Sequence, residues 1–191
     1  MNRISVEEFK EAEKLPLIVV LDDVRSMYNI GSVFRTSDAF RVEAVYLCGI
    51  TGTPPHPEIH KTALGGEDSV NWKYFPTALE AVRELKDKDY HVFAIEQCEG
   101  STLLPELQLE PITEGSQLRG YAVVFGNEVK GVHQEVIDEC QGCLEIPQFG
   151  TKHSMNVSVT AGIVIWEFAR KLLLNQSGTG LKGSVHAPRK L

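Results

Sequence analysis

Residues 146–174, IPQFGTKHSMNVSVTAGIVIWEFARKLLL, run from a short apolar stretch through a polar loop into a long apolar helix. One face of this helix carries apolar side chains at helical spacing, at Val157, Ala161, Val164, Phe168 and Leu172. A second face carries Val159, Ile163 and Trp166. A helix that is apolar on two faces is normally buried. Ser154 to Asn156 stand at its start, where backbone N–H groups lack helical partners. The local pattern therefore predicts a core helix capped by Ser or Asn, and it leaves open whether the helix start also faces a ligand.

Apolar runs alternate with helical patterns along the rest of the chain. Strands are expected at 17–23, 43–50, 70–75, 90–96, 121–127 and 143–147; those at 17–23 and 121–127 are of the buried type, and 70–75 alternates. Helices are expected at 5–14, 33–40, 77–88 and 133–140. Loops are expected at 25–32, 51–69 and 97–119, the last with a short LLPEL element. This alternation predicts an α/β fold with a mainly parallel sheet flanked by helices, and such folds bind ligands at the C-terminal ends of their strands.

Length and composition suit a single globular domain with a real core, because the chain has 191 residues and 42% of them are hydrophobic. No run of about 18 residues is free of polar breaks, so no membrane span is expected. The charged start, MNRISVEEFKEAEK, lacks the apolar core of a signal peptide. Four cysteines are few for a disulfide scaffold and suit a reducing cytosol, which predicts a cytoplasmic protein.

The chain is expected to divide into a short helical extension at 1–16, one α/β domain at 17–175 and a flexible basic tail at 176–191. The net charge of −7 argues against a protein coated with basic groups. From Arg170 onward, however, the sequence has five Lys or Arg residues and no Asp or Glu. This local surplus is compatible with a basic nucleic-acid site, and equally with a tail that serves only solubility.

Cysteine and histidine spacing does not predict a metal site. Cys140 and Cys143 form a single C-x-x-C pair, and the six histidines show no tight ligand spacing. The G-x-G-x-x-G pattern at 178–183 has neither a strand before it nor a helix after it, so it does not predict a phosphate cradle. No metal is therefore expected.

A polar stretch, NIGSVFRTSDAF at 29–40, follows the first predicted strand. Asn29 and Gly31 suit a tight loop, and Asn29 or Ser32 is a candidate cap for the helix that follows. Arg35 carries a planar fork of donors that grips a phosphate with two hydrogen bonds. Taken alone, the same residues also fit a helix cap beside an ordinary surface arginine.

A second polar stretch, VFGNEVKG at 124–131, begins where a buried strand runs directly into glycine. Gly126 would let a ligand approach the backbone closely, because it has no side chain. Glu128 would accept hydrogen bonds at the start of a helix. Taken alone, the stretch also fits a plain connection between a strand and a helix.

These three stretches together resemble the three motifs of the SpoU (TrmH-like) branch of the SPOUT RNA methyltransferases. The first motif, N-x-G-x-x-x-R, is met by Asn29, Gly31 and Arg35. The second, F-G-x-E-x-x-G, is met by Phe125, Gly126, Glu128 and Gly131. The third, I-P-x-x-G-x-x-x-S-L-N-V-S-x-A, is met by Ile146, Pro147, Gly150, Ser154, Asn156, Val157 and Ser158. Met155 replaces the usual leucine, and Thr160 stands where small apolar residues are common. The resemblance runs from about Leu17 to Leu174.

The resemblance implies transfer of a methyl group from S-adenosylmethionine to a ribose 2′-hydroxyl of RNA. It also implies a deep trefoil knot formed by the C-terminal segment and a homodimer packed through the knot region. Cofactor contacts would come from Glu96, Gly126, Ile146, Ser154 and Met155. Catalytic residues would be Arg35, Asn29, Glu128, Ser154 and Asn156. RNA contacts would come from Arg25, Arg35, Lys152 and Lys182.

Arg35 is expected to clamp the target phosphate rather than act as a base, because a guanidinium stays protonated in proteins. In this family the arginine can act in the partner subunit's site. Relatives modify transfer RNA or ribosomal RNA, and the short N-terminal helix and basic tail favour transfer RNA. Two other interpretations stay open: a non-catalytic RNA-binding module with the same fold, and an α/β enzyme that acts on a small nucleotide.

Overall fold

The computed structural model describes residues 4–152 and 154–174. Within them a seven-stranded sheet has the order β3-β2-β1-β6-β4-β7-β5, and every adjacent pair of strands is parallel. The strands are β1 (Leu15–Asp22), β2 (Val42–Cys48), β3 (Asn71–Phe75), β4 (Tyr90–Ile95), β5 (Thr102–Leu103), β6 (Gly120–Phe125) and β7 (Gly142–Glu145). The predicted α/β fold with a parallel sheet is therefore confirmed. The predicted tail at 176–191, with Lys182, lies outside the described residues.

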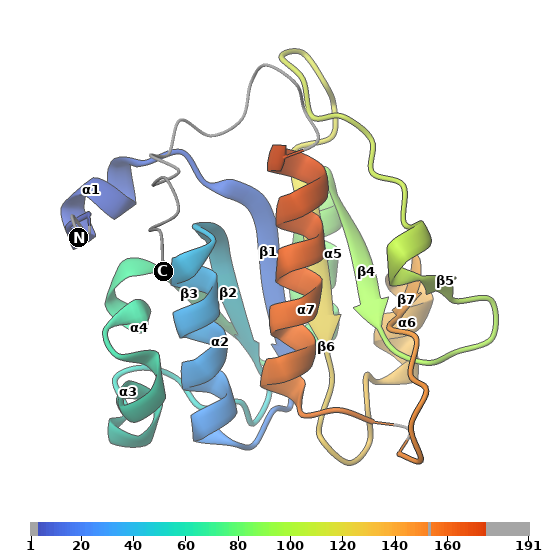
Figure 1. Cartoon of the computed structure of the whole chain (residues 1–191), viewed down its shortest axis with the longest axis horizontal. Coiled ribbons are helices and arrows are strands. Elements are labelled where there is room, and N and C mark those ends of the chain that lie inside the picture. The colour runs from blue at the N-terminus through green and yellow to red at the C-terminus, as the bar shows by residue number, and fades with distance from the viewer. Residues whose placement is uncertain (1–3, 153, 175–191) are drawn as a thin grey trace, which may run out of the picture.

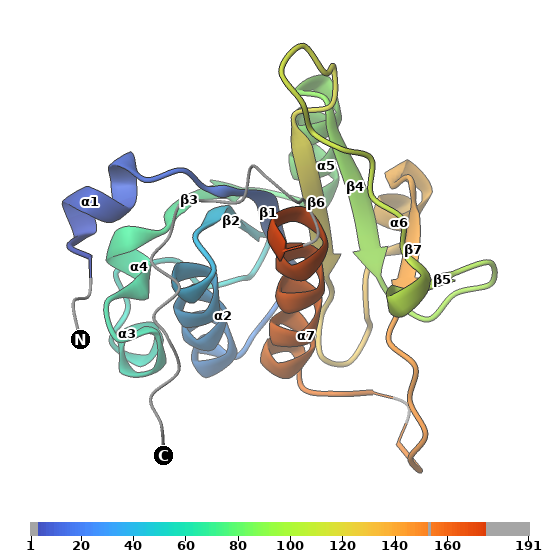
Figure 2. The same cartoon turned by 45° about the horizontal axis from the view of Figure 1, so that its top comes forward.

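Helices cover both faces of this sheet (Figures 1 and 2). On one face, α2 (Met27–Ala39) and α7 (Val157–Ala169) lie side by side, and α3 (Pro57–Ala63) and α4 (Gly66–Ser69) pack outside α2. On the other face lie α5 (Ala78–Asp87) and α6 (Gln134–Glu139). Three short elements complete the chain: α1 (Val6–Glu11), the 3-10 turn η1 (Leu104–Glu106) and the π-helical end of α7, η2 (Arg170–Leu174).

The side chains of β1 show how the core is divided. Because side chains alternate along a strand, Leu17, Val19 and Leu21 pack with α2 and α7, and Ile18 and Val20 pack with α5 and α6. All five are buried. A parallel strand covered on both faces is apolar at every position, which explains the continuous apolar run in this part of the sequence.

The first helix is shorter than expected. It begins with a capping box, the S-x-x-E pattern of Ser5 and Glu8: the Ser5 side chain accepts a hydrogen bond from Glu8 N, and the Glu8 side chain accepts one from Ser5 N. The helix ends at Glu11 rather than at residue 14, and Pro16 lies inside β1 instead of ending the helix. Proline fits there because the pairing of β1 with β2 is irregular between Leu15 and Ile18, so a missing N–H interrupts no regular ladder.

Two segments expected as loops are helical, so those two predictions are wrong. The segment 25–32 contains the start of α2, whose N-cap is Ser26 rather than Asn29 or Ser32. Gly31 lies inside this helix. The position requires glycine, because a Cβ there would overlap Thr62 and the backbone of Ile59 in α3. The glycine that suggested a loop is instead a place where two helices touch closely.

The segment 51–69 forms α3 and α4. Pro57 occupies the first turn of α3, where its missing N–H costs nothing, and the His56 side chain caps that helix by accepting from Glu58 N at 3.2 Å. These helices were not predicted because the segment contains many proline and glycine residues, which usually indicate a loop. Proline at a helix start is nevertheless itself a helix signal.

The long apolar helix is buried on one face only. Val157, Ala161, Val164, Phe168 and Leu172 are buried as predicted. The second face is exposed in the single chain, with Val159 at 54%, Ile163 at 37% and Trp166 at 47% exposure. We call this exposed row the α7 apolar face.

The structure also joins Cys98 and Cys143 in a disulfide, which the small number of cysteines had not predicted. The two positions meet because β4 and β7 are paired, with Ile95 opposite Leu144. Over the described ranges 4–152 and 154–174, no helix is long and apolar enough to cross a membrane.

Candidate active site

A cavity of about 740 Å³ opens at the C-terminal ends of β4, β6 and β7, beside the start of α7. Figure 1 shows these strand ends at the lower edge of the sheet. The loops that follow these three strands form its walls. All five residues predicted to contact a cofactor line this cavity, namely Glu96, Gly126, Ile146, Ser154 and Met155. Glu128 and Asn156 line it as well. The second and third motifs therefore meet at one place, as expected for the strand ends of a parallel sheet.

The loop after β6 folds back on itself, and this explains the glycine at position 126. Asn127 and Gly131 exchange two backbone hydrogen bonds, with N···O distances of 3.0 and 2.9 Å. A Cβ at Gly126 would overlap the backbone of Gly131 and Val132. The sequence suggested that Gly126 makes room for a ligand, whereas in the structure the returning loop itself occupies the space beside it.

Asn127 organises this loop, and sequence analysis missed it. Its side-chain amide donates to the Asp23 carbonyl at 2.7 Å, and its Oδ1 accepts from Val129 N at 2.9 Å and Lys130 N at 3.2 Å. The residue is buried. An asparagine that accepts from the N–H two residues later is a turn signal, which was present in the sequence as Asn127-Glu-Val129.

Glu96 holds the same loop from the other side of the cavity. Its Oε2 accepts from Val132 N at 3.1 Å, and its Oε1 accepts from Gln97 N at 3.0 Å. Gly131 has a φ of +71° and lies so close to Glu96 that a Cβ would overlap the carboxylate. The carboxylate thus fixes the cavity wall and at the same time faces the cavity.

Three motif residues, Asn29, Glu128 and Asn156, are joined by hydrogen bonds. The Glu128 carboxylate accepts from Arg25 N and Ser26 N, each at 3.2 Å, and from the Asn29 side chain at 3.4 Å. The Asn29 Oδ1 in turn accepts from the Asn156 side chain at 3.0 Å. One chain of contacts therefore connects the loop after β6, the start of α2 and the start of α7.

The ionisation of Glu128 follows from these contacts. Burial raises the pKa of its carboxyl, but hydrogen bonds from its own backbone N–H, Arg25, Ser26 and Asn29 together lower that pKa below its ordinary value. Glu128 is therefore ionised at neutral pH, and its negative charge lies at the N-terminus of α2, where the helix dipole favours it.

Asn156 is the N-cap of α7, which confirms one of the two residue types, Ser or Asn, predicted for this cap. Its Oδ1 accepts from Ser158 N at 2.9 Å and from Val159 N at 3.4 Å, while its Nδ2 reaches Asn29. Ser154, the other candidate, is exposed at the cavity wall. The side chain that caps the helix thus also ties it to the first motif.

The predicted RNA-binding residues are spread over the surface. Arg35 is exposed on α2, nearly two turns beyond Asn29, and is not among the described residues that line the cavity. Arg25 and Lys152 are exposed, and the Arg25 backbone also donates to Glu128. The structure therefore brings together the residues predicted to contact the cofactor and separates Arg35 from them within one chain.

Asp22, Asp23 and His133 form a cluster at the end of β1 that the sequence did not predict. The His133 Nδ1 lies 2.8 Å from the buried Asp22 carboxylate, and its Nε2 lies 3.8 Å from Asp23. The hydrogen bond and charge of Asp22, followed by the charge of Asp23, raise the pKa of His133. The three side chains have metal-ligating atoms, but in this arrangement they pair with one another and fix the start of α6.

The cavity lining suits a nucleoside that carries a positive charge. Its apolar part includes Ile95, Phe125, Leu144, Ile146 and Val157. Glu96 and Glu128 present carboxylates beside these side chains. S-adenosylmethionine, the cofactor implied by the motifs, has an adenine ring for an apolar wall and a cationic sulfonium for nearby carboxylates. The residues present therefore fit this cofactor.

Comparison with known proteins gives one family. The model of the SpoU rRNA Methylase family matches residues 16–166. A tRNA (guanosine(18)-2′-O)-methyltransferase of Thermus thermophilus is 30% identical over 172 residues, which cover 90% of this chain and 84% of that protein. A 23S rRNA (guanosine-2′-O-)-methyltransferase of Neisseria meningitidis is 30% identical over 174 residues, which cover 91% of this chain and 66% of that protein.

Solved structures share the fold. A TrmH/SpoU tRNA modifying enzyme of A. aeolicus gives a TM-score of 0.72 at 23% identity, over 87% of this chain and 81% of that one. An AdoMet-bound rRNA methyltransferase of Sinorhizobium meliloti gives a TM-score of 0.74 at 24% identity, over 86% of this chain and 60% of that one. Because the family model spans most of the sequence and its second and third motifs meet at one cavity, the chain belongs to the SpoU rRNA methylase family.

Proposed function

We propose that this protein transfers a methyl group from S-adenosylmethionine to a ribose 2′-hydroxyl of RNA, with transfer RNA as the favoured substrate. The observation that carries the proposal is the hydrogen-bonded set Asn29, Glu128 and Asn156 at a nucleoside-sized cavity, in a chain of the SpoU family. The names of two relatives, a tRNA and a 23S rRNA 2′-O-methyltransferase, support the reaction type.

When bound, the cofactor supplies a methyl group on a sulfonium, which is already a good leaving group. The protein's contribution is then proximity and orientation. Glu96 and the loop after β6 form one side of the cavity. Another side is formed by Ile146, Gln148, Ser154, Met155 and Asn156. Glu128 is ionised and close to this space, so it adds electrostatic attraction for the cationic centre.

Arg35 acts on the RNA rather than on the cofactor. Its guanidinium offers only donors, so it clamps a phosphate beside the target ribose and lowers the pKa of the 2′-hydroxyl electrostatically. The phosphate contact is bidentate, which also fixes the orientation of the ribose. Arg25, Lys152 and Lys182 add phosphate contacts that supply affinity without sequence information.

A homodimer brings this arginine to a cavity. Within one chain Arg35 lies outside the cavity lining, on α2. This helix packs against α7, which carries the exposed α7 apolar face. Packing of that face against a second copy would bury it and carry the partner subunit's Arg35 toward the cavity. The trefoil knot and the cytoplasmic location are further parts of this proposal.

Transfer RNA is favoured over ribosomal RNA by the extent of the similarity. The alignment covers 84% of the tRNA-modifying relative and 66% of the rRNA-modifying one, so this chain matches more of the smaller, tRNA-type protein. Ribose-methylation mapping of total RNA from cells with and without the protein identifies the substrate. Loss of a methyl group only from ribosomal RNA would reverse the choice.

The Arg35→Ala variant tests the mechanism. We expect S-adenosylmethionine to bind with unchanged affinity, because Arg35 does not line the cavity, and methyl transfer to fall by about 10²–10³-fold, as when one transition-state donor is removed. Calorimetry measures the first quantity and transfer of labelled methyl groups to bulk transfer RNA the second. Arg35→Lys keeps the charge without the fork and should recover only part of the loss.

Arg83→Ala is the matched control, because this arginine is exposed on α5, on the opposite face of the sheet, where it pairs with Glu139. Full methyl transfer in Arg35→Ala would refute the assigned role. A wild-type protein that binds RNA but no S-adenosylmethionine would be a non-catalytic RNA-binding module. One that binds no RNA even at low salt would instead be an enzyme acting on a small nucleotide.

A further inference from the structure

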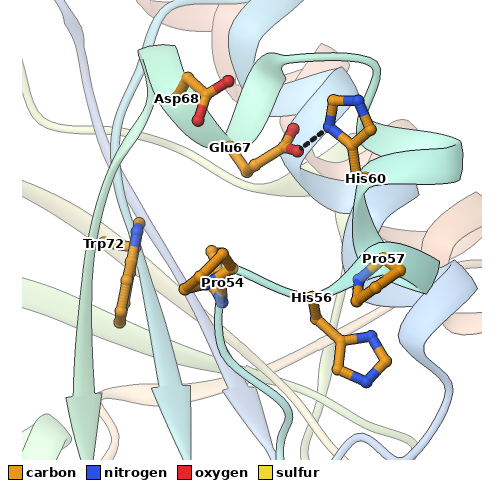
Figure 3. A pocket seen from close by; sticks show the side chains of 8 residues that line it. Pro54, His56, Pro57, His60, Glu67, Asp68 and Trp72 are labelled. Carbon is orange, nitrogen blue, oxygen red and sulfur yellow. Dashed lines mark hydrogen bonds and ion pairs between the residues drawn. The ribbon is translucent and has the colours of Figure 1, made fainter.

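A second pocket, of about 520 Å³, lies away from the cofactor cavity, between β3 and the α3–α4 pair. Figure 3 shows this pocket, which we call the Trp72 pocket. Its lining is Pro54, Pro55, His56, Pro57, His60, Glu67, Asp68 and Trp72. We propose that the Trp72 pocket binds one unstacked base of the RNA substrate, with guanine preferred. This inference rests on the proposed function, since it names how that substrate is held.

The pocket walls are suited to a flat aromatic ring. Trp72 is 39% exposed on the edge strand β3, and in Figure 3 its indole stands beside the ring of Pro54. An exposed indole with proline rings opposite it offers two apolar surfaces and little competing polarity. Proteins that recognise RNA commonly splay out a base and stack it on such an aromatic side chain.

Glu67 is already satisfied within the protein. Its side chain is 7% exposed, its Oε1 lies 2.6 Å from His60 Nδ1, and its Oε2 accepts from Gly65 N at 3.0 Å. Figure 3 shows Glu67 and His60 pointing toward each other. The pair therefore braces α3 against α4, and Glu67 contributes little free negative charge to the pocket.

Asp68 is the exposed carboxylate of the pocket, and it defines the preferred base. A carboxylate only accepts hydrogen bonds, and its two oxygens match two neighbouring donors. Guanine presents two adjacent N–H donors on its Watson–Crick edge, whereas uracil presents one. Stacking on Trp72 supplies affinity for any base, and Asp68 adds the preference for guanine.

The pocket is connected to the proposed active site. Thr51, in the loop that leads to Pro54, accepts from Val24 N at 3.0 Å, and Ile50 N donates to Asp23 at 2.9 Å. On the other side, Gly66 of α4 packs directly against the backbone of Arg35. An RNA strand with a phosphate at Arg35 would therefore have neighbouring nucleotides close to the Trp72 pocket.

Short RNA strands test the proposal directly. The probes are a ten-residue oligouridine and the same strand with one guanosine, each titrated while tryptophan fluorescence is recorded. We expect both strands to quench Trp72, because any base stacks, and the guanosine strand to bind about 5- to 100-fold more tightly, because it adds a bidentate pair with Asp68. Because Trp166 also fluoresces, the quenching of Trp72 is the part of the signal that disappears in Trp72→Phe.

Three variants assign the preference to the pocket. Trp72→Ala should weaken the binding of both strands and reduce the preference for guanosine, because no stacked base is then held beside Asp68. The salt dependence should not change, because stacking releases no counterions. Asp68→Asn should bind both strands equally. Asn71→Ala is the matched control, because Asn71 is exposed on the same strand and its side chain points to the opposite face. Circular dichroism checks that each variant is folded.

Equal affinity of the wild type for the two strands would overturn the proposal, and so would an undiminished preference in Trp72→Ala. Quenching of Trp72 by a short arginine peptide, with none by RNA, would assign the pocket to a protein partner instead. Cofactor binding and methyl transfer are measured on the same samples. Normal transfer without guanosine preference refutes the pocket alone, whereas preference without any transfer refutes the proposed function alone.

Discussion

Adding a single methyl group at Gly126 should disrupt the loop that follows β6. In Gly126→Ala the new Cβ overlaps the backbone of Gly131 and Val132, so we expect a loss of about 1–3 kcal/mol in unfolding free energy, typical of overpacking. S-adenosylmethionine should also bind more weakly, because this loop lines the cavity proposed to hold it. Denaturant unfolding measures the first effect, and calorimetry measures the second.

Gly150→Ala is the control for this experiment. Gly150 belongs to the third motif, but no atom lies within 4 Å of the position of its Cβ, so its substitution should change stability by less than about 0.5 kcal/mol. Equal destabilisation by the two alanines would show that the close approach of the returning loop is not what requires glycine at position 126.

At the level of residues, the sequence was a better guide to which side chains belong to the candidate site than to the hydrogen bonds that each of them makes. Asn29, Glu128 and Asn156 were predicted as site residues and are joined in the structure. Asn127 was missed because its importance lies in a bond to Asp23, a residue 104 positions away in the chain. Contacts over such separations depend on strand order, which periodicity along a sequence does not encode.

At the level of elements, Glu128 is the link that holds the start of α2 to the loop after β6. We expect Glu128→Gln to lower the free energy of unfolding at neutral pH by about 0.5–1.5 kcal/mol, and the melting temperature with it. The reason is that an amide accepts more weakly than a carboxylate from the N–H groups of Arg25 and Ser26.

The pH dependence of this loss has a definite sign. The folded-state pKa of Glu128 is lowered, so its stabilising effect is fully present above the unfolded pKa, at about 4.3, and disappears as pH falls through the lower folded value. The difference between wild type and variant should therefore shrink below about pH 4. Glu114→Gln, in an exposed loop position, serves as control. A difference that stays constant down to pH 2 would mean that the carboxylate charge has no part in it.

Elements were predictable where one pattern dominated. The long parallel strands have continuous apolar runs because both of their faces are covered, and α5 has a clear apolar stripe with Thr77 as its cap. By contrast, α3, α4 and the first turns of α2 contain Gly, Pro or Asn in functional roles. There, close helix contacts and caps require residues that local propensity assigns to loops.

At the level of the whole molecule, the single chain leaves an apolar row of α7 exposed to solvent. Val159, Ile163 and Trp166 form one exposed row along α7, and Trp166 packs against Phe40 of α2 with ring centroids 5.9 Å apart. Apolar helix faces of this kind mark interaction sites. The sequence predicted that this face is buried, and a homodimer is the arrangement that would make that prediction correct.

A charge placed on this face should separate the proposed dimer. In Ile163→Glu a carboxylate would have to be buried without a partner, which costs several kcal/mol and favours the monomer. Light scattering should report a single chain of 21.2 kDa for the variant and twice that mass for the wild type. Methyl transfer should fall with the dimer if, as proposed, the partner subunit's Arg35 completes the site at the cavity.

Leu64→Asp is the matched control, because Leu64 is an equally apolar and 62% exposed side chain that lies at the end of α3, away from α7. It should leave both mass and activity unchanged. An active monomeric Ile163→Glu protein would show that one chain completes the site, with Arg35 reaching RNA bound at its own cavity. A wild type that is monomeric at micromolar concentration would show that the α7 apolar face is not a homodimer interface. A different partner would then have to cover Trp166.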